Sequence, residues 1–439
     1  MKPIGEWIRG SPWTARVATG AFWSVMAAVI SRGFGLLTWM IVARLLGRKV
    51  FGELGILQNT FGLLQNLSLF GLGIMATRYV AQYRASEKQR AGRVVGLSVL
   101  MAAASGTLMG LAAVSAAPWI AARVLGAPHL AGVLEIGAIL VVVYTVTGVL
   151  EGALAGFEAF RQMAMLAVIS GVVSLPLYVW AAWRAGLEGV VWVMVGTGLI
   201  VLALDYWVLR AAARKEGCAV SFRGGRRELR ALFGFSLPVF LSSQTFFGAE
   251  WLGNWLLIRQ PSGFGELGIY SAAARWQQAV LFVPQYVGRA IFPGLTERYG
   301  AGDHSAFKQM LKHYLFVCNG IAVACAAVLS LVSKWIMSGY GSEFTQGWPI
   351  LVIVAVTMVF LPLRWAIQMI YRSIGTVWYE FLLGAAWAVT LLVCMLTLPL
   401  QGAMRLAVST LIAFALTTLA GAVHTGLRLR RRAWHASTA

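Results

Sequence analysis

The sequence lacks most of the features on which a soluble enzyme depends. Only 12% of its 439 residues are charged, and 16 Asp and Glu face 36 Lys and Arg. No G-x-x-x-x-G-K-[ST] motif is present to cradle ATP phosphates. The four cysteines form no C-x-x-C motif and no Cys/His cluster, so we expect neither a disulfide nor a metal site. No cofactor is expected beyond a coupling proton or sodium ion, and any driving energy must come from an ion gradient, the membrane potential or the substrate's own gradient.

Long apolar stretches take the place of these missing features. Apolar residues make up 59% of the chain, in runs of 20 or more rich in Ala, Leu and Gly. Alternating ten-residue strand patterns are absent, which favours a helical bundle over an outer-membrane barrel. We therefore predict an all-α polytopic membrane protein with about twelve transmembrane helices, at residues 17–43, 54–77, 94–117, 132–154, 163–183, 189–209, 231–258, 267–293, 313–333, 347–371, 377–398 and 404–427.

The basic residues fix an expected orientation. The net charge of +20 would suggest nucleic acid in a soluble protein. Here 24 of the 36 Lys and Arg fall in segments that are cytoplasmic if both termini are inside, and 8 fall outside. This bias predicts a multi-pass protein of the cytoplasmic (inner) membrane with cytoplasmic termini and no nucleic-acid partner. Arg44, Arg48 and Lys49 in the first outer segment oppose the rule.

An internal repeat sets the expected domain organisation. The hexapeptide Phe-Gly-Glu-Leu-Gly-Ile occurs at 51–56 and again at 264–269. Two tandem copies with six helices each would enter the membrane in the same direction and form two pseudo-symmetric lobes. We expect a first lobe at 1–209, a basic cytoplasmic linker at 210–230, a second lobe at 231–427 and a basic cytoplasmic tail at 428–439.

Four arginines fall inside the predicted membrane spans. An intramembrane arginine is costly unless it faces a wet cavity or an anionic partner. The planar guanidinium group of arginine can donate two hydrogen bonds to one phosphate, and it keeps its positive charge in a medium of low dielectric constant. The alternative is that each arginine pairs with an internal carboxylate and braces the bundle. The arginines are Arg32, Arg275, Arg289 and Arg364; Gln278 and Gln285 share the helical face of Arg275 and Arg289, and Gln65 is the uncharged counterpart of Gln278 in the first copy.

Few carboxylates are available to balance these cations. Glu250 alone lies deep in a predicted span, and Asp205 lies late in another. A carboxylate at such a position either pairs with an arginine or binds a coupling proton or sodium ion. The two interpretations of Glu250 carry equal weight.

Several short motifs occur at the ends of the predicted helices. They are Thr19–Ser24, Ala43–Gly47, Phe51-Gly52, Leu72-Gly73 to Arg78-Tyr79, Phe235–Pro238, Leu267–Ala273 and Ala290–Pro293. In their order and helix placement these motifs resemble those of the polysaccharide flippases, in the multidrug, oligosaccharidyl-lipid and polysaccharide (MOP) superfamily. The resemblance covers most of the first two helices and helices 7 and 8. Two acidic positions common in relatives are Phe70-Gly71 and Asn254 here, which weakens any borrowed ion-coupling scheme.

The resemblance implies a V-shaped transporter that flips an undecaprenyl-diphosphate-linked oligosaccharide by alternating access through a cationic central cavity. Its partners would be that lipid-linked saccharide, the bilayer and other polysaccharide-assembly membrane proteins. A lipid II flippase is the second hypothesis, because lipid II flippases of this superfamily typically have fourteen helices and twelve are predicted here. An ion-coupled multidrug exporter would need an anionic cavity, contrary to the charge count. A membrane glycosyltransferase or ligase would need a large catalytic external loop, and the outer loops are short.

Overall fold

Two helices of the computed structural model reverse direction at a single residue. The helix α2 runs over Pro12–Leu69 and α6 over Phe160–Lys215, and each is interrupted by one glycine. Gly47 has φ 75° and ψ 166°, and Gly186 has φ 57° and ψ −137°. Glycine alone adopts positive φ without a steric cost, so each glycine ends one span and begins the next. The predicted loops at 44–53 and 184–188 are thus almost entirely helical.

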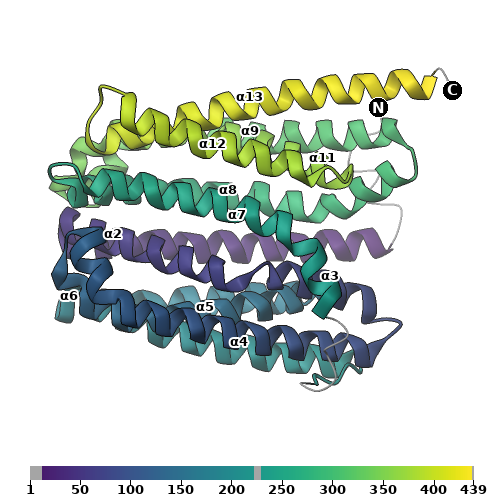
Figure 1. Ribbon diagram of the computed structural model, residues 1–439, viewed down its shortest axis with the longest axis horizontal. Coiled ribbons are helices and arrows are strands. Elements are labelled where there is room, and N and C mark those ends of the chain that lie inside the picture. Colours follow the sequence, from purple (N-terminus) through teal and green to yellow (C-terminus); the bar gives the residue numbers. More distant parts are fainter. Residues whose placement is uncertain (1–11, 222–228, 438–439) are drawn as a thin grey trace. The chain divides into compact units, whose positions relative to one another are not determined.

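The structure describes residues 12–221 and 229–437, and the elements between and after these helices are mostly helical as well (Figure 1). A π-helical segment, η1, continues α4, and short 3₁₀ turns, η2 and η4, precede α5 and α10. The remaining bounds are α3 Leu72–Tyr83, α4 Lys88–Trp119, η1 Ile120–Leu125, η2 Pro128–Leu130, α5 Ala131–Gly156, α7 Leu229–Ile258, α8 Gly263–Gly300, α9 His304–Gly339, η4 Ser342–Gly347, α10 Trp348–Met358, α11 Phe360–Ser373, α12 Val377–Thr397 and α13 Gly402–Ser437.

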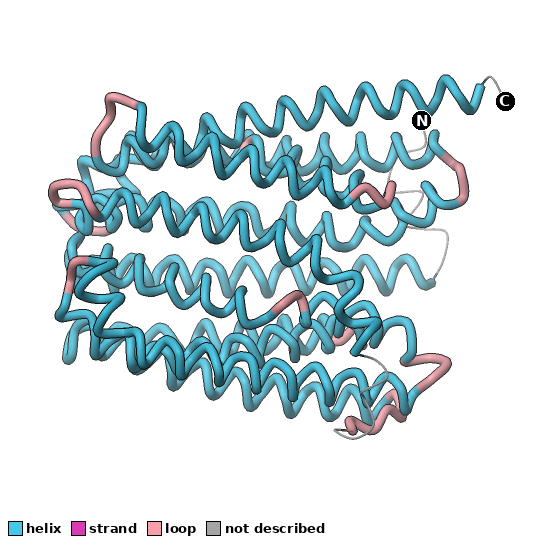
Figure 2. Tube along the Cα trace, viewed as in Figure 1, coloured by secondary structure: helices cyan, strands magenta, loops and turns pink. Residues whose placement is uncertain are grey.

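These helices confirm the predicted all-helical membrane fold with twelve spans. Over residues 12–221 and 229–437, the count takes α2 and α6 as two spans each, joins α3 to the second span of α2, and takes α10 with α11 as one span. Short loops link the helices, as Figure 2 shows. One span is broken: α2 and α3 meet at a bend of 47°. Phe70 and Gly71 both have positive φ there, which accounts for the bend.

The first compact unit comprises Met1–Trp39, Leu64–Ala121 and Pro128–Ser236. Its core lies where α3, α4, α5 and the end of α6 pack together, and it includes Leu72, Val95 and Leu150. A Cβ added to Gly152 of α5 would lie 2.2 Å from the carbonyl oxygen of Gly73 in α3. Small residues at such crossings let helix backbones approach closely within a membrane.

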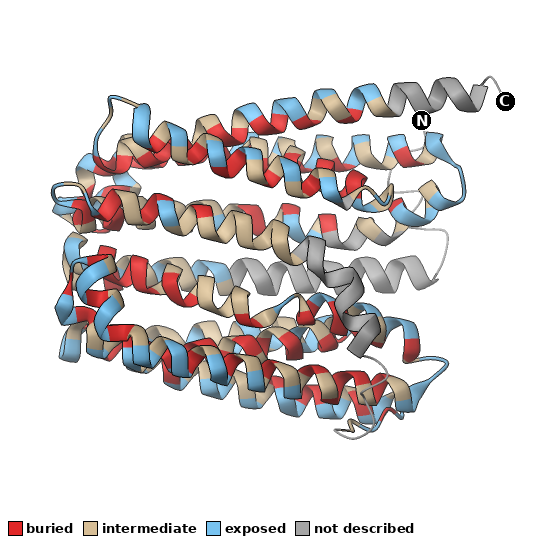
Figure 3. Cartoon of the chain, viewed as in Figure 1, coloured by how far each residue is buried: buried red, intermediate tan, exposed pale blue. Residues whose placement is uncertain are grey.

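The second compact unit comprises Met40–Leu63, Ala122–Ala127 and Leu237–Ala439. Two short segments of the first sequence copy therefore belong to the unit that holds the second copy from Leu237 onward. One apolar core of this unit lies between α8, α9 and α11 and includes Leu295, Phe307 and Ile370. Buried and exposed stripes alternate around its helices (Figure 3). The division of the chain into lobes at 209 and 231 stays a prediction.

Candidate functional site

The two copies of the repeated hexapeptide pack directly against each other within the second unit. A Cβ added to Gly52 would lie 1.7 Å from the carbonyl oxygen of Phe264, and one added to Gly268 would lie 2.0 Å from that of Arg48. Gly55 approaches the Oγ of Ser271 in the same way, at 2.6 Å from an added Cβ. Only glycine permits this backbone contact. We call the crossing of residues 48–55 with residues 264–271 the hexapeptide crossing.

The hexapeptide crossing places Arg275 beside α2. Arg275 follows one turn further along α8, is half-buried, and donates from Nη2 to the Oε1 of Gln58 at 2.6 Å. Its guanidinium also lies 5.6 Å from the ring centre of Phe51. The partner in this hydrogen bond, Gln58, is a neutral amide. Gln278 and Gln285, further along the predicted face of α8, are exposed.

Further contacts join neighbouring segments of the second unit on the predicted outer side. The backbone N–H of Arg48 donates to Oε2 of Glu343 at 3.1 Å. Arg259 donates from Nη2 to the carbonyl oxygens of Arg123 and Val124, at 2.7 and 2.6 Å. The indole N–H of Trp255 donates to the Val124 carbonyl at 2.8 Å. Arg259 therefore caps the π-helical end of the third span, a role that its sequence position did not suggest.

Arg364 has very different surroundings. Its side chain is buried, with 4% of the residue exposed, and its Nη1 donates to the Oγ1 of Thr417 at 3.1 Å. The guanidinium lies 5.5 Å from the ring of Phe414 and 5.9 Å from that of Trp387. No salt bridge of Arg364 occurs among the residues that the structure describes. We call Thr417, Phe414 and Trp387 the Arg364 cage.

The other predicted polar residues lie in separate places. Arg32 is exposed in the first unit, where the hydroxyl of the preceding Ser31 donates to the Ala167 carbonyl at 2.8 Å. Gln65, also in the first unit, donates to the carbonyl of Tyr144 at 3.1 Å. Arg289 lies in α8, and its side chain is outside the described residues.

The two ion-coupling candidates differ in their neighbours. Glu250 of α7 interacts electrostatically with Tyr270 of α8, whose hydroxyl is hydrogen-bonded to Thr410 of α13. In the described ranges Glu250 makes no salt bridge. Asp205 is 4% exposed in the first unit, its Oδ2 has no hydrogen-bond partner there, and its electrostatic neighbour is Glu151, another carboxylate.

Two acceptors that sequence reasoning missed hold the start of α13. Oε1 of Gln260 accepts from the backbone N–H of Gly402, and Oε2 of Glu266 accepts from that of Ala403, both at 2.9 Å. Glu266 belongs to the repeated hexapeptide, so its recurrence was the available signal. A carboxylate at a helix N-terminus satisfies an unpaired donor and complements the helix dipole.

Comparisons with known proteins agree with this architecture. A family model described as "Polysaccharide biosynthesis protein" matches residues 17–298. The chain is 23% identical over 374 residues to the EPS I polysaccharide export inner membrane protein EpsE of Ralstonia solanacearum, covering 83% of this chain and 82% of that protein. It is 24% identical over 335 residues to the lipid III flippase of Escherichia coli (strain K12), covering 75% and 78%.

Solved structures share the fold at low sequence identity. One is an inward-facing multidrug resistance MATE family transporter of the MOP superfamily, with a TM-score of 0.77 at 14% identity over 94% of this chain and 98% of that one. Another is a MOP superfamily transporter from Pyrococcus furiosus that is described as having a binding pocket of reverse polarity. Its TM-score is 0.73 at 15% identity, covering 96% and 97%.

Proposed function

The chain belongs to the polysaccharide biosynthesis protein family, and on that premise we propose that it flips a polyprenyl-diphosphate-linked oligosaccharide across the cytoplasmic membrane by alternating access. At the coarser level it is a transporter of the MOP superfamily related to polysaccharide exporters and flippases, not an enzyme. The family match over residues 17–298 carries this conclusion. The relatives named for inner-membrane export and for lipid III flipping support the location and the substrate class.

The chemistry of the head group explains why arginines matter. A diphosphate cannot cross about 30 Å of hydrocarbon unpaired, because desolvating such an anion costs tens of kcal/mol in a continuum estimate. Fixed guanidinium groups replace part of the lost hydration and can donate two hydrogen bonds to a phosphate. A carrier for this substrate therefore needs arginines that the head group can reach.

Arg275 fits this requirement best among the predicted residues. It is half-buried rather than enclosed, and its Nη2 donates to the neutral amide of Gln58. Gln278 and Gln285 on α8 are exposed and can add contacts to the head group. Arg32 is exposed in the first unit, and its contact with substrate stays a prediction. In this proposal Arg364 braces α11 against α12 and α13, the alternative role considered for each arginine.

Alternating access adds a requirement for the hexapeptide crossing. A path that opens on the predicted outer side requires residues 40–63 to separate from α8, which breaks the contact of Gly52 with Phe264 and the hydrogen bond of Arg48 with Glu343. Each hydrogen bond contributes about 1 kcal/mol, so a few of them can be exchanged during a transport cycle.

Glu250 and Asp205 are the proposed sites for a coupling proton or sodium ion. Glu250 lacks a salt bridge in the described ranges, and Asp205 has a carboxylate as its electrostatic neighbour. Two nearby carboxylates, or one without a cation, favour uptake of a proton or a metal cation.

Reconstituted protein tests the proposed function directly. A fluorescent polyprenyl-diphosphate saccharide in proteoliposomes should reach the opposite leaflet, whereas the same saccharide on an uncharged polyprenyl ether should not. A lipid II analogue and a cationic drug serve as alternative cargoes. Transport of the drug but not of either diphosphate would replace the proposal with the multidrug-exporter reading. Faster flipping of lipid II than of the oligosaccharide carrier would favour the second hypothesis.

A further inference from the structure

The two arms of α6 enclose a groove that the transport proposal does not use. The arms reverse at Gly186 and touch near that turn, where a Cβ on Gly189 would lie 2.7 Å from the Ala181 carbonyl oxygen. Beyond the contact they leave a groove of about 300 Å³ that continues to Thr197 and Ile200. Gly196 lines it, and an added Cβ there would meet no atom within 4 Å.

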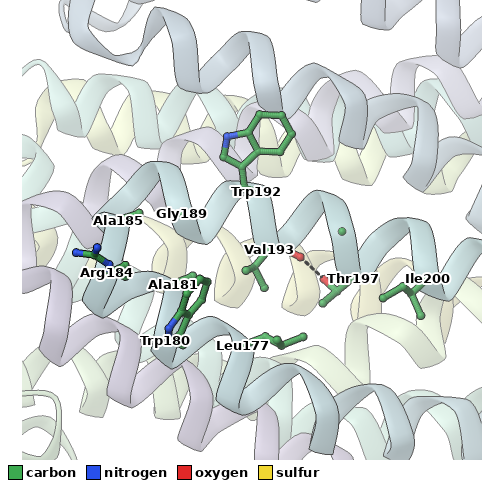
Figure 4. A pocket seen from close by; sticks show the side chains of 11 residues that line it. Leu177, Trp180, Ala181, Arg184, Ala185, Gly189, Trp192, Val193, Thr197 and Ile200 are labelled. Atoms are coloured by element: carbon green, nitrogen blue, oxygen red, sulfur yellow. Dashed lines mark hydrogen bonds between the residues drawn. The ribbon is translucent and has the colours of Figure 1, made fainter.

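The walls of the groove are apolar and face outward. Trp180 and Trp192 are 61% and 51% exposed and come from opposite arms (Figure 4). In a membrane-spanning chain, exposed side chains of this kind face lipid, and tryptophan is enriched where the hydrocarbon meets the head groups. The groove is therefore open to the bilayer.

One cation stands at the end of the groove nearest the turn. Arg184 contributes the single charged side chain of the lining, and it is exposed (Figure 4). Arg184 makes no hydrogen bond or ion pair within the described part of the chain. The nearest carboxylate in sequence, Glu188, follows the reversal at Gly186 and lies outside the lining, and no salt bridge joins it to Arg184. An exposed guanidinium at the membrane surface is suited to a lipid phosphate.

The length of the groove indicates which lipid it holds. Eleven residues separate Gly189 from Ile200, which at 1.5 Å per residue is about 16 Å along the helix. That is close to half of the roughly 30 Å hydrocarbon core, the depth of one leaflet. A straight acyl chain of one leaflet matches this length, whereas a long polyprenyl chain exceeds it.

From these features we infer that the α6 groove binds one anionic phospholipid of the leaflet on the side of the Gly186 turn, with an acyl chain between Trp180 and Trp192 and its phosphate on Arg184. This inference does not depend on which cargo is transported. The bound lipid fills a void between the two arms and should stabilise them against separation.

Native mass spectrometry of the purified full-length protein tests the inference. With equimolar phosphatidylglycerol and phosphatidylcholine in detergent, the wild type should retain one phosphatidylglycerol per chain with at least tenfold preference. Arg184→Gln should lose this head-group preference, and Gly196→Leu, which fills the open space, should lose the bound lipid altogether. Arg161→Gln, an exposed arginine elsewhere in the same helix, is the matched control and should behave as wild type.

Two results would overturn the inference. One is equal retention of phosphatidylglycerol by the wild type, Arg184→Gln and Gly196→Leu. The other is complete displacement of phosphatidylglycerol by equimolar polyprenyl phosphate, which would assign the groove to the carrier lipid. Thermal unfolding of each variant in detergent identifies a folding defect, and Gly196→Ala provides a milder filling of the groove if Gly196→Leu does not assemble.

Discussion

Arg275 and Arg364 lie in spans of the same repeat and carry the same charge, yet the structure surrounds them differently. Arg275 is half-buried and bonded to the neutral amide of Gln58. Arg364 is enclosed by Phe414, Trp387 and Thr417. A cation in an aromatic cage stabilises helix packing, whereas one on a polar, partly open face can meet a ligand. The position of an arginine inside a span therefore does not define its role.

Breaking the hexapeptide crossing should have the largest effect, because it positions Arg275. In Gly268→Leu the new side chain would collide with the backbone of Arg48, and two backbones cannot relax as flexible side chains do. Gly268→Leu cannot close the crossing, so we expect less folded, monodisperse protein in size-exclusion chromatography and loss of flipping by any protein that stays folded. Gly62→Ala on the same face of α2, where an added Cβ meets no atom within 4 Å, should remain folded. A stable Gly268→Leu protein that flips the substrate at the wild-type rate would contradict the close contact.

Truncation of Arg364 should have the next largest effect. Arg364→Ala leaves a cavity inside the Arg364 cage and should lower the free energy of unfolding by about 2 kcal/mol or more. Arg364→Met fills the same volume, and the Thr417 hydroxyl keeps its hydrogen bond to the Ala413 carbonyl at 2.7 Å, so its stability should be near wild type. Thermal unfolding in detergent measures both. Equal destabilisation by Met and Ala would mean that the charge, and not the packing, is required.

Removal of the Glu250 carboxylate should have a smaller effect, confined to coupling. Glu250→Gln keeps the shape of the side chain but removes the negative charge and cannot take up a proton. We expect flipping to continue and its stimulation by an imposed proton or sodium gradient to fall several-fold. Glu188→Gln, an exposed carboxylate at the turn of α6, should leave the stimulation intact. If the gradient still stimulates flipping by Glu250→Gln as strongly as by the wild type, Glu250 is not the coupling residue. Asp205 would then be the remaining candidate, or transport would not be coupled to these ions.

The sequence predicted the spans and the repeat because both depend on local patterns. Apolar runs located the twelve spans, and the shared hexapeptide revealed two copies. It did not predict that Gly47 and Gly186 reverse the chain without loops, because a lone glycine is also tolerated inside a helix. The sequence also did not predict that the two hexapeptides touch. A repeat indicates that two segments occupy equivalent positions in the two copies, but it does not indicate that they are in contact.

The site was predictable to a similar extent. Helical periodicity placed Arg275, Gln278 and Gln285 on one face, and the last two are indeed exposed. The same periodicity could not distinguish Arg275 from Arg364, because it shows which residues share a face and not what packs against that face. The partners that separate them, Gln58 and Thr417, lie 217 and 53 residues away in sequence.

The most direct test of the account compares two variants in one flipping assay. Arg275→Gln removes charged hydrogen bonds worth about 1.5–3 kcal/mol each, so flipping of the polyprenyl-diphosphate saccharide should fall at least about tenfold with the fold retained. The flipping rate of Arg275→Lys should lie between those of the wild type and Arg275→Gln, because lysine keeps the positive charge but cannot donate two parallel hydrogen bonds to one phosphate. Arg364→Met should flip the substrate at close to the wild-type rate. Normal flipping by Arg275→Gln together with loss of flipping in a stable Arg364→Met protein would contradict the account.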